Sequence, residues 1–199
     1  MGFILVVMKI NNSYTTFRAR LLNNKASIGK IIEGGCPDYS LYRASFIQID
    51  PTNPCDINAL KKTADYWING SLTTNIYYAA CALRNKSNAY KNHEIFALTT
   101  QKSNYDKLNS DNILGLVHTS PYEDGFTLIE QLQGNPEYVR SIKPDYKGIG
   151  TEILESLKQI YDKLSCYPTA EEYVIRFYKK NGFIKEPNSS NYYTYCKII

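Results

Sequence analysis

The feature that most constrains the fold is a strongly amphipathic segment that begins at two closely spaced glycines, Gly148 and Gly150. Apolar residues recur there every three or four positions and form one stripe, and charged residues occupy the opposite side. Because an apolar face has to be buried, the segment predicts a surface helix that lies on a sheet. The stripe consists of Ile149, Ile153, Leu154, Leu157, Ile160, Tyr161 and Leu164.

Short apolar runs bounded by turn residues predict the strands of that sheet. They are interleaved with helical segments and include a hairpin-like middle and end. This order indicates a mixed α/β (α+β) fold in which helices cover a mixed sheet. The predicted strands are Ala44–Ile49, Glu94–Thr100, Asn112–Thr119, Phe126–Gln133, Phe183–Lys185 and Tyr192–Ile198.

Capping residues mark two further helices. The helix Asp56–Ile68 is expected to begin with Asp56 as its N-cap. A second helix is expected to begin at a capping box formed by Thr169 and Glu172 and to end at Gly182. The segment Asn75–Arg84 fits a helix or a strand equally well.

The length of 199 residues and the 43% hydrophobic content suit a single domain with an ordinary core. Residues 41–199 are predicted to form the main domain, and residues 1–40 an N-terminal extension packed on it. Within the extension, Phe3–Ile10 and Phe17–Leu22 resemble strands, and Gly29–Tyr39 reads as a loop.

Charge and cysteine usage exclude several classes of protein. A net charge of +4 is well below the clustered excess of a nucleic-acid binder. Five scattered cysteines without a CxxC pair argue against a disulfide framework and a thiolate zinc site. The apolar run Phe3–Met8 is far shorter than the roughly 20 residues that span a bilayer, and it lacks the basic leader and small-residue cleavage site of a secretory signal. We therefore expect a cytoplasmic protein without a membrane partner.

The two glycines at the head of the amphipathic helix also suit a phosphate group. Glycine lets the backbone approach a ligand closely, and the unpaired N–H groups of a first helical turn attract an anion. Lys147 would add a full positive charge beside them. The alternative is an ordinary loop-to-helix turn. Neither the P-loop motif nor the three-glycine dinucleotide motif is present.

Two segments together resemble the GCN5-related N-acetyltransferase (GNAT) family. Pro144–Leu154, with Gly148-Ile149-Gly150, is similar to the family's Q/R-x-x-G-x-G/A pyrophosphate motif and the helix that follows it. Phe177–Phe183, Phe-Tyr-Lys-Lys-Asn-Gly-Phe, is similar to its F-Y-x-x-x-G-F ending. Their order and spacing also match, and the resemblance covers roughly Asn112 to the C-terminus. Asp145 departs from the motif, because arginine or glutamine is usual at its first position.

The resemblance implies a three-layer fold with a central, mostly antiparallel sheet flanked by helices. It implies an acyl-CoA-dependent N-acetyltransferase, in which acetyl-CoA enters between two splayed strands and a primary amine attacks the thioester directly. Acetyl-CoA is then the co-substrate and no metal is needed. The expected coenzyme A-binding residues are Leu132, Gln133, Lys147, Gly148, Ile149, Gly150 and Thr151.

Two residues are the candidate catalytic groups. Tyr178 matches the family's proton donor to the departing thiolate, and its alternative role is packing beside Val174 and Phe177. Glu130 is the candidate base, because strand alternation places it on the apolar face of Leu128 and Leu132, where desolvation raises a carboxyl pKa. The alternatives are that Glu130 is a strand-end glutamate paired with a lysine, or that the register of the strand differs from this alternation.

Other reactive residues have weaker claims. His118 alternates with Leu114 and Leu116 and could line the acceptor side, although a histidine on such a face is more often structural. Cys166 has no neighbour in sequence that would lower its pKa, which argues against a covalent acyl-cysteine. Glu123 and Asp124 are expected to be solvated turn acids, or to meet a cationic acceptor.

The acceptor is expected to be a small-molecule or peptide amine, and the sequence does not choose among such amines. A homodimer is common for this fold, although no exposed apolar stripe argues for one. The alternative from another class is a non-catalytic module that senses acyl-CoA or docks a partner on the same fold.

Overall fold

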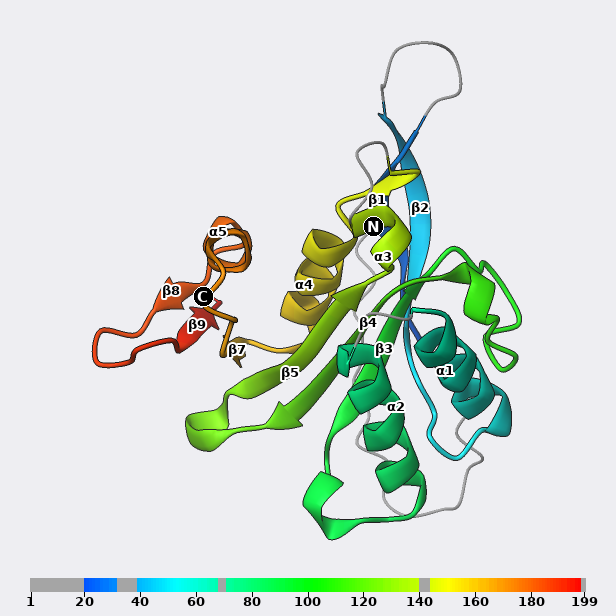
Figure 1. Ribbon diagram of the computed structural model, residues 1–199, viewed down its shortest axis with the longest axis horizontal. Coiled ribbons are helices and arrows are strands. Elements are labelled where there is room, and N and C mark those ends of the chain that lie inside the picture. Colours follow the sequence, from blue (N-terminus) through cyan, green and yellow to red (C-terminus); the bar gives the residue numbers. More distant parts are fainter. Residues whose placement is uncertain (1–19, 32–38, 68–70, 140–143, 198–199) are drawn as a thin grey trace, which may run out of the picture.

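The computed structural model describes residues 20–31, 39–67, 71–139 and 144–197, which build one nine-stranded sheet with helices on both faces (Figure 1). The strand order is β6-β1-β2-β3-β4-β5-β7-β9-β8. Every neighbouring pair is antiparallel except β5 and β7, which run parallel. The strands are β1 Arg20–Ile31, β2 Tyr39–Gln48, β3 Glu94–Thr99, β4 Ile113–Pro121, β5 Thr127–Gly134, β6 Tyr146–Lys147, β7 Lys163–Cys166, β8 Ile184–Lys185 and β9 Tyr193–Cys196.

Two hydrophobic clusters fill the space on either side of the sheet and define three layers. One lies beneath α1 and α2 and includes Leu60, Ile76 and Leu116. The other lies beneath α4 and α5 and includes Ile153 and Leu157. The predicted fold, a mostly antiparallel sheet flanked by helices, is therefore confirmed. The helices are α1 Pro54–Tyr66, α2 Ser71–Arg84, α3 Pro136–Val139, α4 Ile149–Ile160 and α5 Glu172–Lys180, with short 3-10 helices η1 Asn88–Tyr90, η2 Ser110–Asn112 and η3 Glu123–Gly125.

Helix α4 begins at Ile149 as the apolar stripe predicts, but it ends earlier than predicted. Tyr161 already has an extended backbone, with φ −120° and ψ 131°. Leu164 is buried in β7, where it pairs with Thr127 of β5 and Tyr195 of β9. The apolar stripe predicts a longer helix because Leu164, although it belongs to the short strand β7, is buried in the same core that α4 covers.

Helix α1 begins two residues before its predicted start. Asn53 is the N-cap and accepts a hydrogen bond from the Cys55 N–H, and Pro54 occupies the first turn. Asp56 is instead a buried residue of the first turn, and its carboxylate accepts the Asp50 N–H at 2.9 Å. Burial raises the pKa of Asp56 to about 6. The ambiguous segment 75–84 is helical and belongs to α2.

The predicted capping box of α5 is wrong. Glu171 is the N-cap and makes no side-chain cap bond, and the Thr169 hydroxyl donates instead to the Glu171 carboxylate at 3.2 Å. The other end is confirmed: α5 ends before Gly182, whose φ is +81°, and the Phe183 ring packs on Tyr178 with centroids 5.2 Å apart.

Strand β1 belongs to the same sheet and the same core as the rest of the chain. It pairs along β2 and with β6, and it buries Ala26 and Ile28 beneath α4. The loop predicted from residue 29 is therefore wrong at both ends, since β1 continues to Ile31 and β2 starts at Tyr39. The strand predicted at 3–10 lies outside the described residues. The division into an extension of residues 1–40 and a main domain of residues 41–199 stays a prediction.

Candidate functional site

The two parallel strands of the sheet separate halfway along β5. Pairing between β5 and β7 is limited to Thr127–Ile129 with Leu164–Cys166. Beyond Ile129, β5 continues to Gly134, and β4 is its only strand partner among the described residues. The divergence is visible in Figure 1. The backbone edge of β5 that carries Leu132 and Gln133 is therefore open to an extended ligand on the β7 side.

A β-bulge lies where the strands separate. His118 of β4 pairs with Gln131, but Thr119 pairs with Ile129, so Glu130 is an extra residue without a partner. Glu130 and Gln131 both line a cavity on the α2 side, whereas Leu132 packs against the core beneath α4. The alternation predicted for Glu130 is therefore wrong. Its side chain is exposed rather than buried on an apolar face.

The glycine turn precedes α4 on the other side of β5. Gly148 is the N-cap with φ +82°, in the left-handed region that favours glycine, and no side chain caps the helix there. The first-turn N–H groups of Ile149, Gly150 and Thr151 therefore have neither an intrahelical acceptor nor a capping side chain. Gly148, Lys147 and Thr151 are exposed. The turn is thus an accessible, electropositive helix end.

Gly150, the second glycine, is needed for a different physical reason, which is close packing against α5. A Cβ on Gly150 would lie 3.0 and 3.1 Å from two ring atoms of Phe177 and 3.8 Å from the Leu132 side chain. A Cβ on Gly148 would instead meet nothing within 4 Å. Gly150 thus lets α5 approach the start of α4, and it brings the glycine turn next to the open part of β5.

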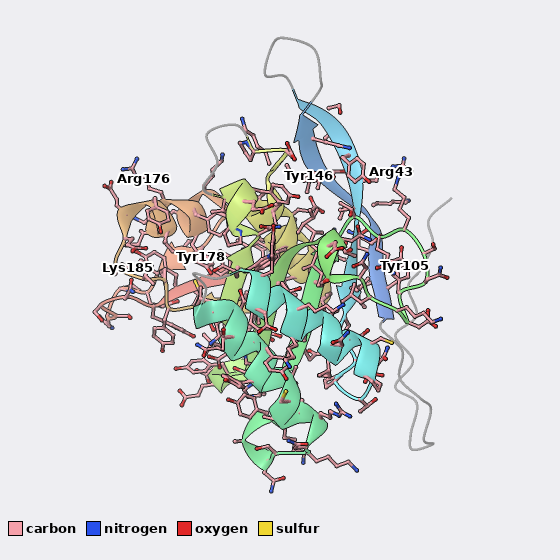
Figure 2. The ribbon with its side chains drawn as sticks, turned by 45° about the vertical axis from the view of Figure 1, so that its right-hand side comes forward. Arg43, Tyr105, Tyr146, Arg176, Tyr178 and Lys185 are labelled. Carbon is pink, nitrogen blue, oxygen red and sulfur yellow. The ribbon has the colours of Figure 1, made fainter. Side chains whose placement is uncertain are left out.

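Tyr178 is buried between α5 and the sheet. Tyr178, which is labelled in Figure 2, is 7% exposed. Its ring packs edge-on against the rings of Phe177 and Phe183, with centroids 5.2 Å apart in both pairs. Burial, with a smaller contribution from Cys166, raises the pKa of Tyr178 well above its ordinary value. Tyr178 therefore stays protonated at neutral pH and does not act as a base there.

The cavity on the α2 side has a volume of about 560 Å³. It adjoins the separation of β5 and β7 through Glu130, whose carboxylate accepts the Ser120 hydroxyl at 2.6 Å. His118 lines this cavity; the sequence left open whether it lines the acceptor side or is a structural residue. The polar and aromatic lining residues are Asn75, Tyr78, Tyr90, His93, His118, Glu130 and Gln131.

Both histidines of the chain meet in this cavity, an arrangement that the sequence did not predict. His93 Nδ1 lies 3.0 Å from His118 Nε2, and His118 Nδ1 lies 3.1 Å from Gln131 Oε1. Burial lowers the pKa of both rings, so both are neutral at pH 7. One sequence feature could have indicated that the two histidines meet: His93 comes just before a strand that pairs with the strand of His118. The bulge that places Gln131 beside the histidines has no recognisable pattern in the local sequence.

The remaining candidates lie away from this constellation or cannot react there. Glu123 and Asp124 belong to the exposed 3-10 turn at the opposite end of β5 and do not line the cavity. Burial raises the pKa of the Cys166 thiol, which disfavours the thiolate that a covalent acyl-cysteine requires. Among the described residues, no group of three or more His, Cys, Asp or Glu side chains is arranged to hold a metal ion.

Solved structures similar to this chain include acetyltransferases of the GNAT family. A protein described as a GNAT acetyltransferase from Desulfovibrio desulfuricans is 14% identical, with a TM-score of 0.49 over 77% of this chain and 98% of its own. An acetyltransferase from an Exiguobacterium species is 18% identical, with a TM-score of 0.49 over 77% of this chain and 93% of its own. The N-acetyltransferase PseH of Campylobacter jejuni, in complex with acetyl coenzyme A, is 12% identical, with a TM-score of 0.45 over 75% of this chain and 95% of its own.

No protein-family model and no curated protein matches the sequence. No helix in the described parts of the chain has the length and apolar character needed to cross a membrane.

Proposed function

We propose that the protein is an acyl-CoA-dependent N-acyltransferase that transfers an acetyl group from acetyl-CoA to a primary amine. The observation that carries this proposal is the placement of two different sites on one strand. The open edge of β5 adjoins the glycine turn of α4 through Leu132, and the bulge of the same strand lines the cavity through Glu130. An acyl-CoA bound along β5 would place its thioester next to the cavity, where an amine could bind.

The residues present fit coenzyme A. The first-turn N–H groups of Ile149, Gly150 and Thr151 would hold the pyrophosphate, and Gly148 keeps their approach clear. Lys147 would add positive charge at the turn. The backbone of Leu132 and Gln133 would pair with the amides of the pantetheine arm, because that edge has no strand partner among the described residues. Asp145 replaces the usual arginine or glutamine of the turn, so the backbone supplies the main contacts.

The chemistry requires two proton transfers around one nucleophilic attack. The amine nitrogen bonds to the thioester carbonyl carbon, and the carbon–sulfur bond then breaks. Glu130 takes the proton released by that nitrogen, directly or through a water, and Tyr178 gives its proton to the departing thiolate. After product release Glu130 gives its proton to solvent, and Tyr178 takes a proton from solvent, which restores both groups. Holding both substrates against one strand supplies a large part of the acceleration.

Acetyl-CoA binding is tested first by thermal unfolding. A ligand that binds only the native state raises the melting temperature, so we expect a rise that grows with acetyl-CoA concentration. Release of free CoA is then measured with a panel of small amines, peptides with free N-termini and lysine peptides. Amine-dependent release supports the transferase. Stabilisation by acetyl-CoA without release with any amine would favour the acyl-CoA-sensing module, and an unchanged melting temperature would remove both.

The proposal also covers the nature of the acceptor. The acceptor is an amine of small-molecule or peptide origin, and the lining of the cavity by Glu130, Tyr78 and Tyr90 suits a cationic group. The cytoplasmic location and a homodimer stay predictions.

A further inference from the structure

An amine substrate presents a problem that Glu130 and Tyr178 do not solve. Most primary amines are ammonium ions at pH 7, and an ammonium nitrogen has no lone pair with which to attack a thioester. One proton therefore has to leave before the attack that Glu130 and Tyr178 assist. Because Glu130 takes the proton released after the attack, this earlier proton needs a second base, which must be unprotonated at pH 7 and carry a free lone pair in the cavity.

The hydrogen bonds between the two histidines determine which ring nitrogen has that lone pair. An amide oxygen can only accept, so the proton of His118 lies on Nδ1, which donates to Gln131 Oε1 at 3.1 Å. His118 Nε2 then has to accept, and the donor at 3.0 Å is His93 Nδ1–H. His93 Nε2 is left as the unprotonated nitrogen. It lies on the side of the ring opposite the bond to His118.

The surroundings of the pair favour that role. His93 is partly exposed and lines the cavity, whereas His118 is buried behind it. The Tyr90 ring lies 5.0 Å from His93 and 6.3 Å from His118, centroid to centroid, and helps to fix both rings. The charged and titratable groups that face the pair are Glu130 of β5, Tyr78 of α2 and Tyr90 of η1. Glu94, next to His93 in the chain, is engaged elsewhere with Gln48 and Tyr161.

We infer that His93 Nε2 takes the first proton of the acceptor ammonium, and that His118 and Gln131 are positioning residues that hold His93 in the Nδ1–H tautomer. The inference rests on the proposed N-acyltransferase function. The ammonium loses one proton to His93 and becomes a neutral amine, and His93 becomes an imidazolium beside the Glu130 carboxylate. After transfer, His93 returns this proton to solvent. Glu130 and Tyr178 keep the later proton steps.

The tautomer is tested without any turnover by NMR of protein labelled with ¹⁵N-histidine. Because the chain has only two histidines, the spectrum contains two rings. We expect both rings to carry the proton on Nδ1 at pH 7 and their titrations to be mutually dependent. A proton on Nε2 of either ring, or two independent titrations, would overturn the inference even if the protein acetylates amines.

A substitution at Gln131 sharpens the same experiment. Gln131→Glu places a carboxylate against His118 Nδ1–H and should raise the pKa of both rings, as well as the pH at which kcat/KM falls on acidification. Asn75→Asp, which adds the same charge elsewhere on the cavity wall, is the matched control. If both variants raise the histidine pKa values equally, the added charge alone explains the effect. The chain of hydrogen bonds from Gln131 through His118 to His93 would then not control the protonation of His93.

The catalytic role is tested with two acceptors. His93→Asn should lower kcat/KM at pH 7 by about 100-fold or more for a strongly basic amine. It should have little effect for aminoacetonitrile, which is already neutral at that pH. Equal losses for both amines would overturn the proton-acceptor role and indicate a structural histidine. Absence of turnover with every amine in the wild-type protein contradicts the proposed function instead, and the NMR result still decides the tautomer.

Discussion

The donor half and the acceptor half of the candidate site are built in different ways. The donor half uses one contiguous turn, Tyr146–Thr151, and the open edge of β5 beside it. The acceptor half gathers side chains from α2, η1, β4 and β5 around one cavity. A turn that binds through backbone N–H groups depends on a few neighbouring residues, whereas a cavity depends on the register of several strands. The donor half should therefore tolerate side-chain changes that the acceptor half does not.

The largest effect is expected at Tyr178, which lies in the core beneath α4 and α5 and does not line the cavity. Tyr178→Phe removes the proton donor without changing the packing volume much, so kcat should fall by about 100-fold while the Kd for CoA stays the same. Steady-state rates and calorimetric titration measure the two. Tyr173→Phe, at a 71% exposed position on the same helix, is the control and should change neither. Full activity in Tyr178→Phe would remove this residue from the mechanism.

The next effect concerns packing of the donor half. Gly150→Ala places a methyl group about 3 Å from the Phe177 ring, which should lower the free energy of unfolding by about 1–3 kcal/mol. Urea unfolding measures the loss. Combining Gly150→Ala with Phe177→Leu should recover part of it, because the smaller side chain makes room. If the two losses simply add, the two residues do not constrain each other.

A smaller effect is expected at Gly148, where a loss of CoA affinity can be distinguished from the cost of backbone strain. Gly148→Val should weaken CoA binding by about tenfold, or about 1.4 kcal/mol, because its side chain enters the space the pyrophosphate needs. The strain of a left-handed valine should also cost about 1–2 kcal/mol of stability. Gly125→Val is a matched control, since Gly125 also has a positive φ and open space around its Cβ. Comparable loss of affinity in both variants would show that the turn before α4 is not the phosphate site.

The smallest effect is a pH dependence that belongs to the acceptor half. Burial lowers the pKa of His93 and His118 below the unfolded value of about 6.5, so the unfolded chain binds more protons just below that pH. The contribution of the pair to stability is thus complete above pH 6.5 and declines as the pH falls through the folded pKa values. Urea unfolding gives the free energy of unfolding of the wild type and of a variant that carries both His93→Gln and His118→Gln. The difference in this free energy between the two proteins should become smaller from pH 7 to pH 5. The Asp56 carboxyl is common to both proteins and cancels. A constant difference would mean that the rings titrate as in the unfolded chain.

The accuracy of the sequence predictions differs between the halves for the same reason. The start of α4, the glycine turn and the end of α5 were predictable, because 3.6-residue periodicity and glycine positions are local signals. Leu164 and Glu130 were misplaced, because a short strand and a β-bulge are set by pairing with distant segments. Asp56 and Thr169 were misassigned as caps, because several residues near a helix start can cap it. Asn53 caps α1 and also donates to the Asp106 carbonyl, whereas no side chain caps α5 at Glu171.

By itself the sequence determined the class of fold, the amphipathic helix, the glycine turn and the Phe-Tyr ending, all of which are written in neighbouring residues. Only the tertiary structure decided that β5 separates from β7 after Ile129, that Glu130 is the extra residue of a β-bulge, and that His93 meets His118. These features depend on strand register, and register is a relation between segments that lie far apart in the chain. A shift of one residue would carry Gln131 to the opposite face of the sheet and dismantle the acceptor site, although every local pattern stayed the same.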